Sequence, residues 1–182
     1  MDLAAATRAA ESFLAALGVS CDDESMARSP RRMAEAYAAL LTSRDFEMTT
    51  FPNTEAYDEL VVVRSIPVQS VCEHHFLPFT GVAHVAYLPA GRIVGLSKLA
   101  RVVEMYARRP QTQERLTQQI ADHLDAQLSP RGVGVVIEAE HTCMTLRGVQ
   151  AQGTSTSTSA VKGLLRHNAQ TRAEFYACLR AG

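Results

Sequence analysis

The sequence predicts an α+β fold in which an antiparallel sheet carries two helices on one face. Two β-rich segments, 60–70 and 81–88, come first, two helical segments follow, and two further β-rich segments come after them. Elements grouped in this order favour helices on one face of an antiparallel sheet. The sequence shows neither an internal repeat nor a linker. We therefore expect one domain overall, with an N-terminal helical region at 1–58 and a sheet region at 59–182.

The first 58 residues are expected to hold two helices. Residues 1–18 are rich in alanine but interrupted by polar side chains, which is typical of a short amphipathic helix, and Gly18 lies near its expected end. A second helix is expected from Pro30 to Leu41, because Ser29 is a good N-cap and proline suits the first helical position. Residues 42–58 show no clear period, so we expect an irregular connection there.

The two central helices follow from proline and from apolar spacing. The segment 93–110 enters a helical period and ends at Pro110, because proline removes a hydrogen-bond donor and clashes inside a helix. The segment 111–128 then forms a second helix with one apolar face. The residues of that face recur at every fourth position: Leu116, Ile120, Leu124 and Leu128.

The C-terminal third is expected to add two strands and a helix. Segment 133–141 is rich in β-branched residues and predicts the third strand, and segment 142–150 is expected to be the fourth. Residues 152–160 are low in sequence complexity. The last helix is expected to start near Thr171, where Thr171 and Glu174 fit a capping box.

Composition excludes several classes of function. The formal net charge is −1, so no global positive field attracts nucleic acid or an anionic membrane. No apolar run approaches the roughly 20 residues that cross a bilayer, and the N-terminus lacks the features of a signal peptide. We expect a cytoplasmic protein whose 4 cysteines are reduced.

Two short segments carry candidate metal ligands. One is Cys72-Glu73-His74-His75, and the other is His141-Thr142-Cys143. Thiolate and imidazole are the ligands that zinc prefers. If 141–143 lies on a strand, His141 and Cys143 point to the same face. A catalytic zinc site needs three protein ligands and keeps a water. The set Cys72, His75 and Cys143 leaves His74 and His141 beside the metal for proton transfer.

Other readings of these residues remain open at this point. A closed structural site could use Cys72, His75, His141 and Cys143 together, and a Cys72–Cys143 disulfide is disfavoured by compartment. An isolated cysteine or histidine is usually inert. We place the remaining ones in that class: Cys21, Cys178, His84, His123 and His167.

Candidate substrate ligands lie at the starts of the two central helices. Lys98 and Arg101 share a helix face just after Ser97, where a helix N-terminus attracts anions. Arg147 is expected on the same face as Cys143, so these cations would hold a phosphate chain near the metal; the alternative is a solvated helix face. The carboxylate of Glu114 could accept hydrogen bonds from the guanine N1–H and 2-amino group, although a first-turn glutamate also simply suits the helix dipole.

Three long segments resemble the GTP cyclohydrolase I family. They are CEHHFLPFTGVAHVAYLP (72–89), GLSKLARVVEMYARRPQTQERLTQQI (95–120) and HTCMTLRGVQ (141–150). The spacing is ungapped from Cys72 to Arg147, and weaker similarity extends to SPRRMAEAY and TRAEF. The resemblance implies the tunnelling fold for residues 59–182, assembled as a pentameric barrel and a homodecamer of two stacked rings, with active sites between subunits.

The resemblance also implies a reaction and a role for each matching residue. GTP is hydrolysed at C8, formate is released and the product is 7,8-dihydroneopterin triphosphate. Zinc would be held by Cys72, His75 and Cys143, and would lower the pKa of bound water from 15.7 toward about 7. The remaining roles are proton transfer by His74 and His141, with His141 protonating N7; assistance to the sugar steps by Ser97; guanine recognition by Gln113 and Glu114; and binding of the ribose and triphosphate by Ser97, Lys98, Arg101, Arg147 and Arg32.

Three alternatives to this function are kept. A relative of the same fold in deazapurine metabolism could form or reduce a nitrile through a cysteine nucleophile without this zinc set. A paralogue could act on a modified purine nucleotide. A non-enzymatic module could hold zinc in a closed site, in which case chelation would unfold it.

Overall fold

The computed structural model describes residues 1–180, which form two compact units. The first unit, Met1–Thr42, contains the two predicted helices, α1 (Leu3–Ala16) and α2 (Ser29–Leu40), which pack against each other. The carboxylate of Asp2 accepts a hydrogen bond from the Ala5 N–H and caps α1. Gly18 follows α1 with a φ of +76°, a conformation that glycine adopts without strain.

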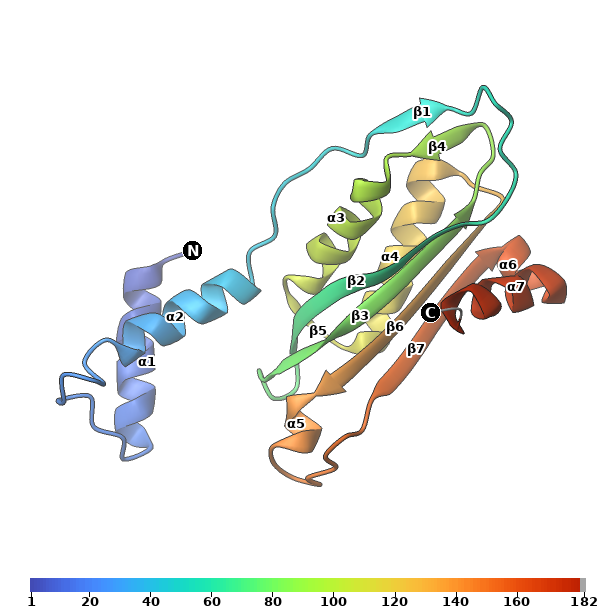
Figure 1. Ribbon diagram of the computed structural model, residues 1–182. Coiled ribbons are helices and arrows are strands. Elements are labelled where there is room, and N and C mark those ends of the chain that lie inside the picture. The colour runs from blue at the N-terminus through green and yellow to red at the C-terminus, as the bar shows by residue number, and fades with distance from the viewer. Residues whose placement is uncertain (181–182) are drawn as a thin grey trace. The chain divides into compact units, whose positions relative to one another are not determined.

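The second unit, Ser43–Gly182, is built on a five-stranded sheet with the order β5-β2-β3-β6-β7 (Figure 1). The four long strands, β2 (Val61–Cys72), β3 (Pro78–Leu88), β6 (Gly132–His141) and β7 (Thr156–Gly163), pair antiparallel to one another in that order. The short β5 (Pro110–Gln111) lies parallel to the end of β2.

A separate two-stranded sheet begins the second unit. It pairs β1 (Thr50–Pro52) with β4 (Arg92–Val94). Neither strand was predicted. Residues 42–58 were expected to be an irregular connection of the N-terminal region, and β4 overlaps the segment 93–110 that was expected to be helical. Their pairing joins residues about forty positions apart, so three-residue strands of this kind leave no local period to detect.

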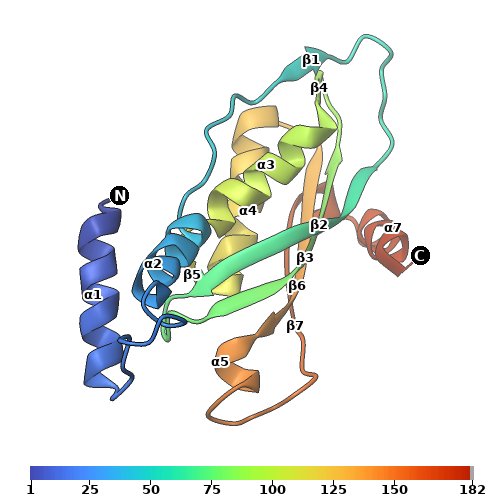
Figure 2. The ribbon, with the colours of Figure 1, turned by 60° about the vertical axis from the view of Figure 1, so that its left-hand side comes forward.

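Helices cover both faces of the large sheet (Figure 2). The predicted central helices, α3 (Leu96–Ala107) and α4 (Gln113–Leu128), lie together on one face, as expected. Two further helices, α6 (Leu164–His167) and α7 (Ala169–Arg180), pack on the opposite face. The expectation of helices on one face alone was therefore incomplete. The cap of α7 also differs from the predicted one, because the Asn168 side chain accepts hydrogen bonds from the N–H groups of Gln170 and Thr171.

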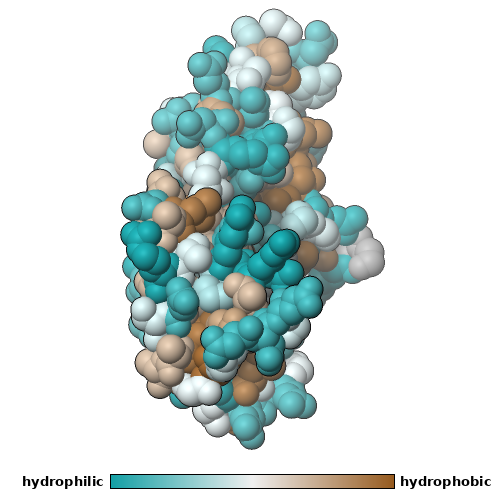
Figure 3. Space-filling model, turned by 90° about the vertical axis from the view of Figure 1, so that its left-hand side faces the viewer, coloured by the Kyte–Doolittle hydropathy of each residue, from teal (hydrophilic) through white to brown (hydrophobic). Residues whose placement is uncertain are grey.

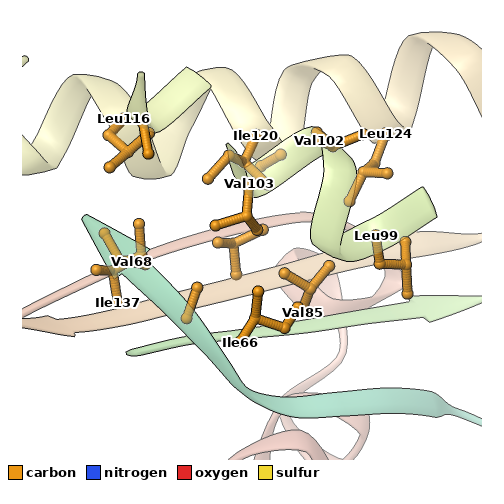
Figure 4. Close-up of a cluster of buried hydrophobic side chains, with 14 of the residues drawn as sticks. Ile66, Val68, Val85, Leu99, Val102, Val103, Leu116, Ile120, Leu124 and Ile137 are labelled. Atoms are coloured by element: carbon orange, nitrogen blue, oxygen red, sulfur yellow. The ribbon is translucent and has the colours of Figure 1, made fainter. Parts of the chain in front are cut away.

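The main core lies between the sheet and the helices α3 and α4 (Figure 4). Alternate residues of each strand point into it, as the period of two requires. A β-bulge between Val63 and Ile66, with Ser65 at a φ of +56°, changes the register of β2. The core includes the predicted apolar face of α4 and residues of α3 and the sheet: Ile66, Val68, Val85, Leu99, Val102, Val103, Leu116, Ile120, Leu124 and Ile137.

The predicted fourth strand is wrong in position. Residues 142–145 form a single helical turn, α5 (Thr142–Thr145), and the strand comes later, at 156–163, overlapping the low-complexity segment 152–160. The Thr142 hydroxyl donates to the Pro78 carbonyl oxygen and turns the chain away from the sheet. In β7 the alternating threonines and serines follow a period of two, with Thr156 and Thr158 half-buried and Ser157 and Ser159 exposed.

Figure 3 shows one face of the molecule, on which hydrophilic side chains are interspersed with smaller hydrophobic areas. Among residues 1–180, no helix is both long and apolar enough to cross a membrane.

Candidate active site

The two cysteine-and-histidine segments meet at one end of the large sheet. Cys72 is the last residue of β2, His141 is the last residue of β6, and Cys143 lies in α5 immediately after it. A tight turn follows Cys72, closed by hydrogen bonds from the Cys72 N–H to the Leu77 carbonyl and from the Phe76 N–H to the Cys72 carbonyl. This turn directs His74 and His75 back toward the Cys72 thiol.

The distances within this cluster suit a metal ion. The Sγ atoms of Cys72 and Cys143 are 3.9 Å apart, and two sulfurs bound at about 2.3 Å to one tetrahedral zinc lie about 3.8 Å apart. The Nδ1 atoms of His75 and His74 lie 3.8 Å and 4.0 Å from the Cys72 sulfur. One ligand atom from each of Cys72, His141 and Cys143 also lies within 4.8 Å of the others. The donor set therefore fits a thiolate-rich zinc site.

His75 and His141 are both candidates for the third ligand. His75 is exposed and belongs to the same turn as Cys72, whereas His141 is half-buried and its ring stacks on Phe79, with the ring centroids 4.5 Å apart. The expectation that Cys143 lies on a strand beside His141 is wrong. The thiol nevertheless reaches the cluster, because the helical turn of α5 brings it back toward Cys72.

Burial shapes the protonation of the cluster. It lowers the pKa of His141 below its ordinary value, against the opposing charge of Glu114. It also raises the pKa of the Cys143 thiol, with the hydrogen bond to Cys72 adding to the effect, while Arg147 acts in the opposite direction. Without a metal, Cys143 therefore holds its proton at neutral pH, and a metal that binds there must displace it.

A cavity of about 300 Å³ opens beside the cluster. Its wall includes the start of α4, where Gln113 is buried and Glu114 is exposed. The residues that line it are Cys72, His74, His75, Gln111, Thr112, Gln113, Glu114, His141, Cys143, Met144 and Thr156. Seven of the residues predicted as metal ligands, proton-transfer groups or guanine ligands are thus brought to one place.

The Gln113 side chain is already engaged by the protein. The two hydrogens of its Nε2 are shared among three acceptors, the carbonyl oxygens of Ile137 and Thr156 at 3.0 and 2.9 Å and the Thr158 hydroxyl at 3.1 Å. Its Oε1 lies 2.8 Å from Nε2 of His141. By contrast, Glu114 keeps an exposed carboxylate at the cavity wall.

The predicted phosphate ligands do not line this cavity. Ser97, Lys98 and Arg101 lie at the start of α3, beside β4 and away from α5 (Figure 1). Arg101 pairs with Glu104 at 3.2 Å. Arg147 is exposed just after α5, not on a strand with Cys143 as expected. Arg32 belongs to the first compact unit.

An ion pair that was not predicted from the sequence supports the turn that carries His74 and His75. The carboxylate of Glu73 contacts the guanidinium of Arg115 on α4, and the Glu73 N–H donates to the Gln111 carbonyl. Arg115 also donates to the Gln111 side chain and to the Pro110 carbonyl. The sequence held one sign of this ion pair. Glu73 lies between the candidate ligands Cys72 and His74, and Arg115 lies in the first turn of the helix that carries Glu114.

Fold and site together define a mixed α+β protein with a metal-type cluster of two cysteines and three neighbouring histidines at one end of its sheet. A sequence model of the family described as GTP cyclohydrolase I matches residues 6–180. The chain belongs to this family.

Curated relatives agree with this assignment. A protein named GTP cyclohydrolase 1 from Mycobacterium avium (strain 104) is 52% identical over 179 residues, which cover 95% of this chain and 87% of that protein. One of the same name from Mycobacterium tuberculosis (strain H37Rv) is 51% identical over 175 residues, covering 93% and 86%. Among solved structures, an archaeosine synthase QueF-like protein in the apo form gives a TM-score of 0.48 at 20% identity, covering 57% of this chain and 93% of that chain.

Proposed function

We propose that this protein is a zinc-dependent enzyme that hydrolyses the imidazole ring of GTP at C8, releases formate and yields 7,8-dihydroneopterin triphosphate. The observation that carries the proposal is the pair of thiols 3.9 Å apart beside three histidines, at the wall of a cavity that also presents Glu114. Membership of the GTP cyclohydrolase I family supports the substrate and the reaction.

Cys72, His75 and Cys143 are the proposed zinc ligands. The exposed His75 is free to turn about its side-chain bonds toward a metal next to Cys72, whereas one ring nitrogen of His141 is held by Gln113. Zinc bound there would lower the pKa of a coordinated water toward about 7 and supply a nucleophile at neutral pH. His141 would protonate N7 of the purine, and His74 is the second proton-transfer group; help of this kind is typically worth roughly 10²–10⁴-fold.

Glu114 is the proposed guanine ligand. Its carboxylate can accept hydrogen bonds from N1–H and the 2-amino group, and its place at the cavity wall supports this role. Gln113, which was also expected to recognise guanine, instead directs its side chain to protein partners and to His141.

The triphosphate ligands require a second copy of the chain. Ser97, Lys98, Arg101 and Arg147 are proposed to bind ribose and phosphate, with Ser97 also assisting the sugar steps, and Arg32 adds a further contact. Because the start of α3 is at the opposite end of the sheet from the thiols, one chain does not bring these groups into one cavity. Among the described strands, β7 pairs only with β6, which leaves an edge for another subunit. We propose the tunnelling-fold homodecamer of two pentameric rings.

The decisive experiment incubates the purified zinc-loaded protein with GTP and follows pterin absorbance and formate release. We expect one formate per pterin, no product after chelation, and recovery when zinc is restored. His141→Ala should keep zinc but lose product. Loss of zinc in this variant would instead overturn the division between ligands and acid.

The same assay separates the alternatives. A closed structural site predicts bound zinc, no turnover and unfolding upon chelation. A paralogue for a modified purine nucleotide predicts zinc and an intact fold but no formate from GTP.

A further inference from the structure

A buried chain of hydrogen bonds leads from the backbone of α4 to the ring of His141. The Thr117 hydroxyl lies 2.7 Å from the Gln113 carbonyl oxygen and 2.6 Å from the Thr158 hydroxyl. Thr158 in turn contacts Nε2 of Gln113, whose Oε1 contacts Nε2 of His141. Gln113 and Thr117 are 2% and 1% exposed, so water does not compete for these partners.

The direction of every bond in this chain is fixed by backbone carbonyls, which can only accept. Thr117 must donate to the Gln113 carbonyl, so Thr158 donates to Thr117. Thr158 then accepts from the Gln113 amide nitrogen, which also donates to the carbonyls of Ile137 and Thr156. A flipped Gln113 amide would set its oxygen against these two carbonyls, and that arrangement is repulsive.

The last bond therefore assigns a proton on His141. Because the amide nitrogen of Gln113 faces the carbonyls, its Oε1 faces the imidazole and can only accept. Nε2 of His141 must carry a hydrogen, which leaves the lone pair of the neutral ring on Nδ1. The stacking of the ring on Phe79 holds its plane in place.

We infer that Gln113 is a positioning residue that acts through His141, fixing the imidazole as its Nε2–H tautomer so that protons are exchanged only at Nδ1. This inference rests on the proposed function for its catalytic consequence. In that reaction the Nδ1–H bond of the imidazolium breaks as the N7–H bond of the purine forms. The positive charge leaves the imidazole, and the ring returns to the neutral Nε2–H form.

The tautomer can be measured without turnover. ¹⁵N-edited NMR of the imidazole nitrogens, on zinc-free and zinc-loaded protein, should show a protonated Nε2 and an unprotonated Nδ1 for His141, with the signals assigned by their loss in His141→Gln. A neutral His141 with its proton on Nδ1 would overturn the inference. This readout is independent of GTP hydrolysis, so it separates failure of the inference from failure of the proposed function.

Kinetics separate positioning of His141 from guanine recognition by Gln113. Gln113→Met should lower kcat by about 10-fold or more, as loss of a supporting hydrogen bond at a metal site does, with KM and zinc content unchanged. A rise in KM with kcat unchanged would instead make Gln113 a guanine ligand. Glu114→Gln is the comparison, and there we expect KM to rise.

Two further variants keep the test sharp if Gln113→Met folds poorly. Gln118→Met makes the same change at an exposed glutamine of α4 whose side chain donates to Asp122, so the His141 tautomer and kcat should stay as in the parent protein. In a His141→Ala background, Gln113→Met should cause no further loss of kcat, because the residue through which it acts is gone. If the double variant instead lost kcat by the product of the two single-variant factors, the inference would be contradicted.

Discussion

The two ends of the large sheet hold their buried residues in place by different means. At one end, which we call the packed end, Leu165 and Phe175 press against Gly132 and Gly134 of β6. A Cβ on Gly134 would lie 2.7 Å from a Leu165 methyl carbon and 2.8 Å from the Phe175 ring, so only glycine fits without rearrangement. Contacts there are apolar and lack a preferred direction.

At the other end, the site end, several buried side chains are polar and joined by hydrogen bonds. Gln111 donates to the Tyr106 carbonyl and to Gln119, and Gln113 bonds as described above. Hydrogen bonds have direction, so they fix which atom of a side chain faces the cavity. The comparison teaches that the packed end contributes mainly to stability, whereas the site end determines where donor atoms and protons are held. Four predictions test this division, from the largest expected effect to the smallest.

Cys143→Ser should abolish the function of the site end and leave the packed end intact. Removing a zinc ligand should cost more than the roughly 10–100-fold typical of its supporting contacts. We expect loss of bound zinc by atomic emission and loss of formate release, with the far-UV circular dichroism unchanged. Cys178→Ser, on α7, is the matched control and should keep both zinc and turnover. Retained zinc in Cys143→Ser would refute the proposed ligand set.

Phe175→Ala should destabilise the packed end and leave the site end able to bind zinc. Its ring is fully buried, and truncation of such a residue costs about 3–5 kcal/mol of unfolding free energy. Urea unfolding of the zinc-loaded protein should show this loss, while zinc stoichiometry at low temperature stays unchanged. Phe175→Leu should lose less. If Phe175→Ala released zinc without destabilising the fold, the two ends would not be separable in this way.

Arg115→Met should loosen the turn that carries His74 and His75 with little effect on stability. The guanidinium holds the pKa of Glu73 below its usual range and joins the turn to α4. We expect zinc affinity, measured by competition with a chelator, to fall by about 10-fold, while the unfolding free energy changes by less than about 1 kcal/mol. The exposed Arg31–Glu35 pair on α2 provides the control, because Arg31→Met should not change zinc affinity. Equal zinc affinity in both variants would remove Glu73 and Arg115 from the site.

His123 should give the smallest effect, seen only as a dependence on pH. His123 lies on α4 and its ring faces that of Tyr106 on α3. Burial lowers the pKa of His123 below its ordinary value. The unfolded chain then binds a proton more readily than the folded one. This contribution to stability is therefore present above about pH 6.5 and is lost as the pH falls. Urea midpoints between pH 7.5 and 5 should fall less steeply in His123→Gln, and an unchanged slope would contradict the assignment.

The sequence sufficed where a period or a rare donor carried the signal. The strands β2, β3 and β6 and the helices α3 and α4 were predicted from β-branched runs, from Pro110 and from the fourfold spacing that begins at Leu116. The thiols of Cys72 and Cys143 were predicted to meet, because these are the two cysteines that have histidines next to them in the sequence.

Other features depend on tertiary contacts that leave little trace in the sequence. β7 was missed because alternating serine and threonine look like low complexity until β6 pairs with them. α5 was missed because the hydrogen bond from Thr142 to Pro78 links residues far apart in the chain. The position of Lys98 relative to the metal cluster depends on which end of the sheet the start of α3 reaches. The direction of the Gln113 amide depends on the carbonyls of Ile137 and Thr156, which the sheet brings to the start of α4.

The two thiols are 71 residues apart in the chain: Cys72 ends β2, and strands β3 and β6, which pair with each other, lie between it and Cys143. Contacts of such long range form slowly, since the intervening loop must first be closed. The two thiols can therefore share a metal ion only after β2, β3 and β6 have paired in their register. For the proposed zinc enzyme, metal loading would therefore follow the pairing of β2, β3 and β6 and would be a late event in its maturation.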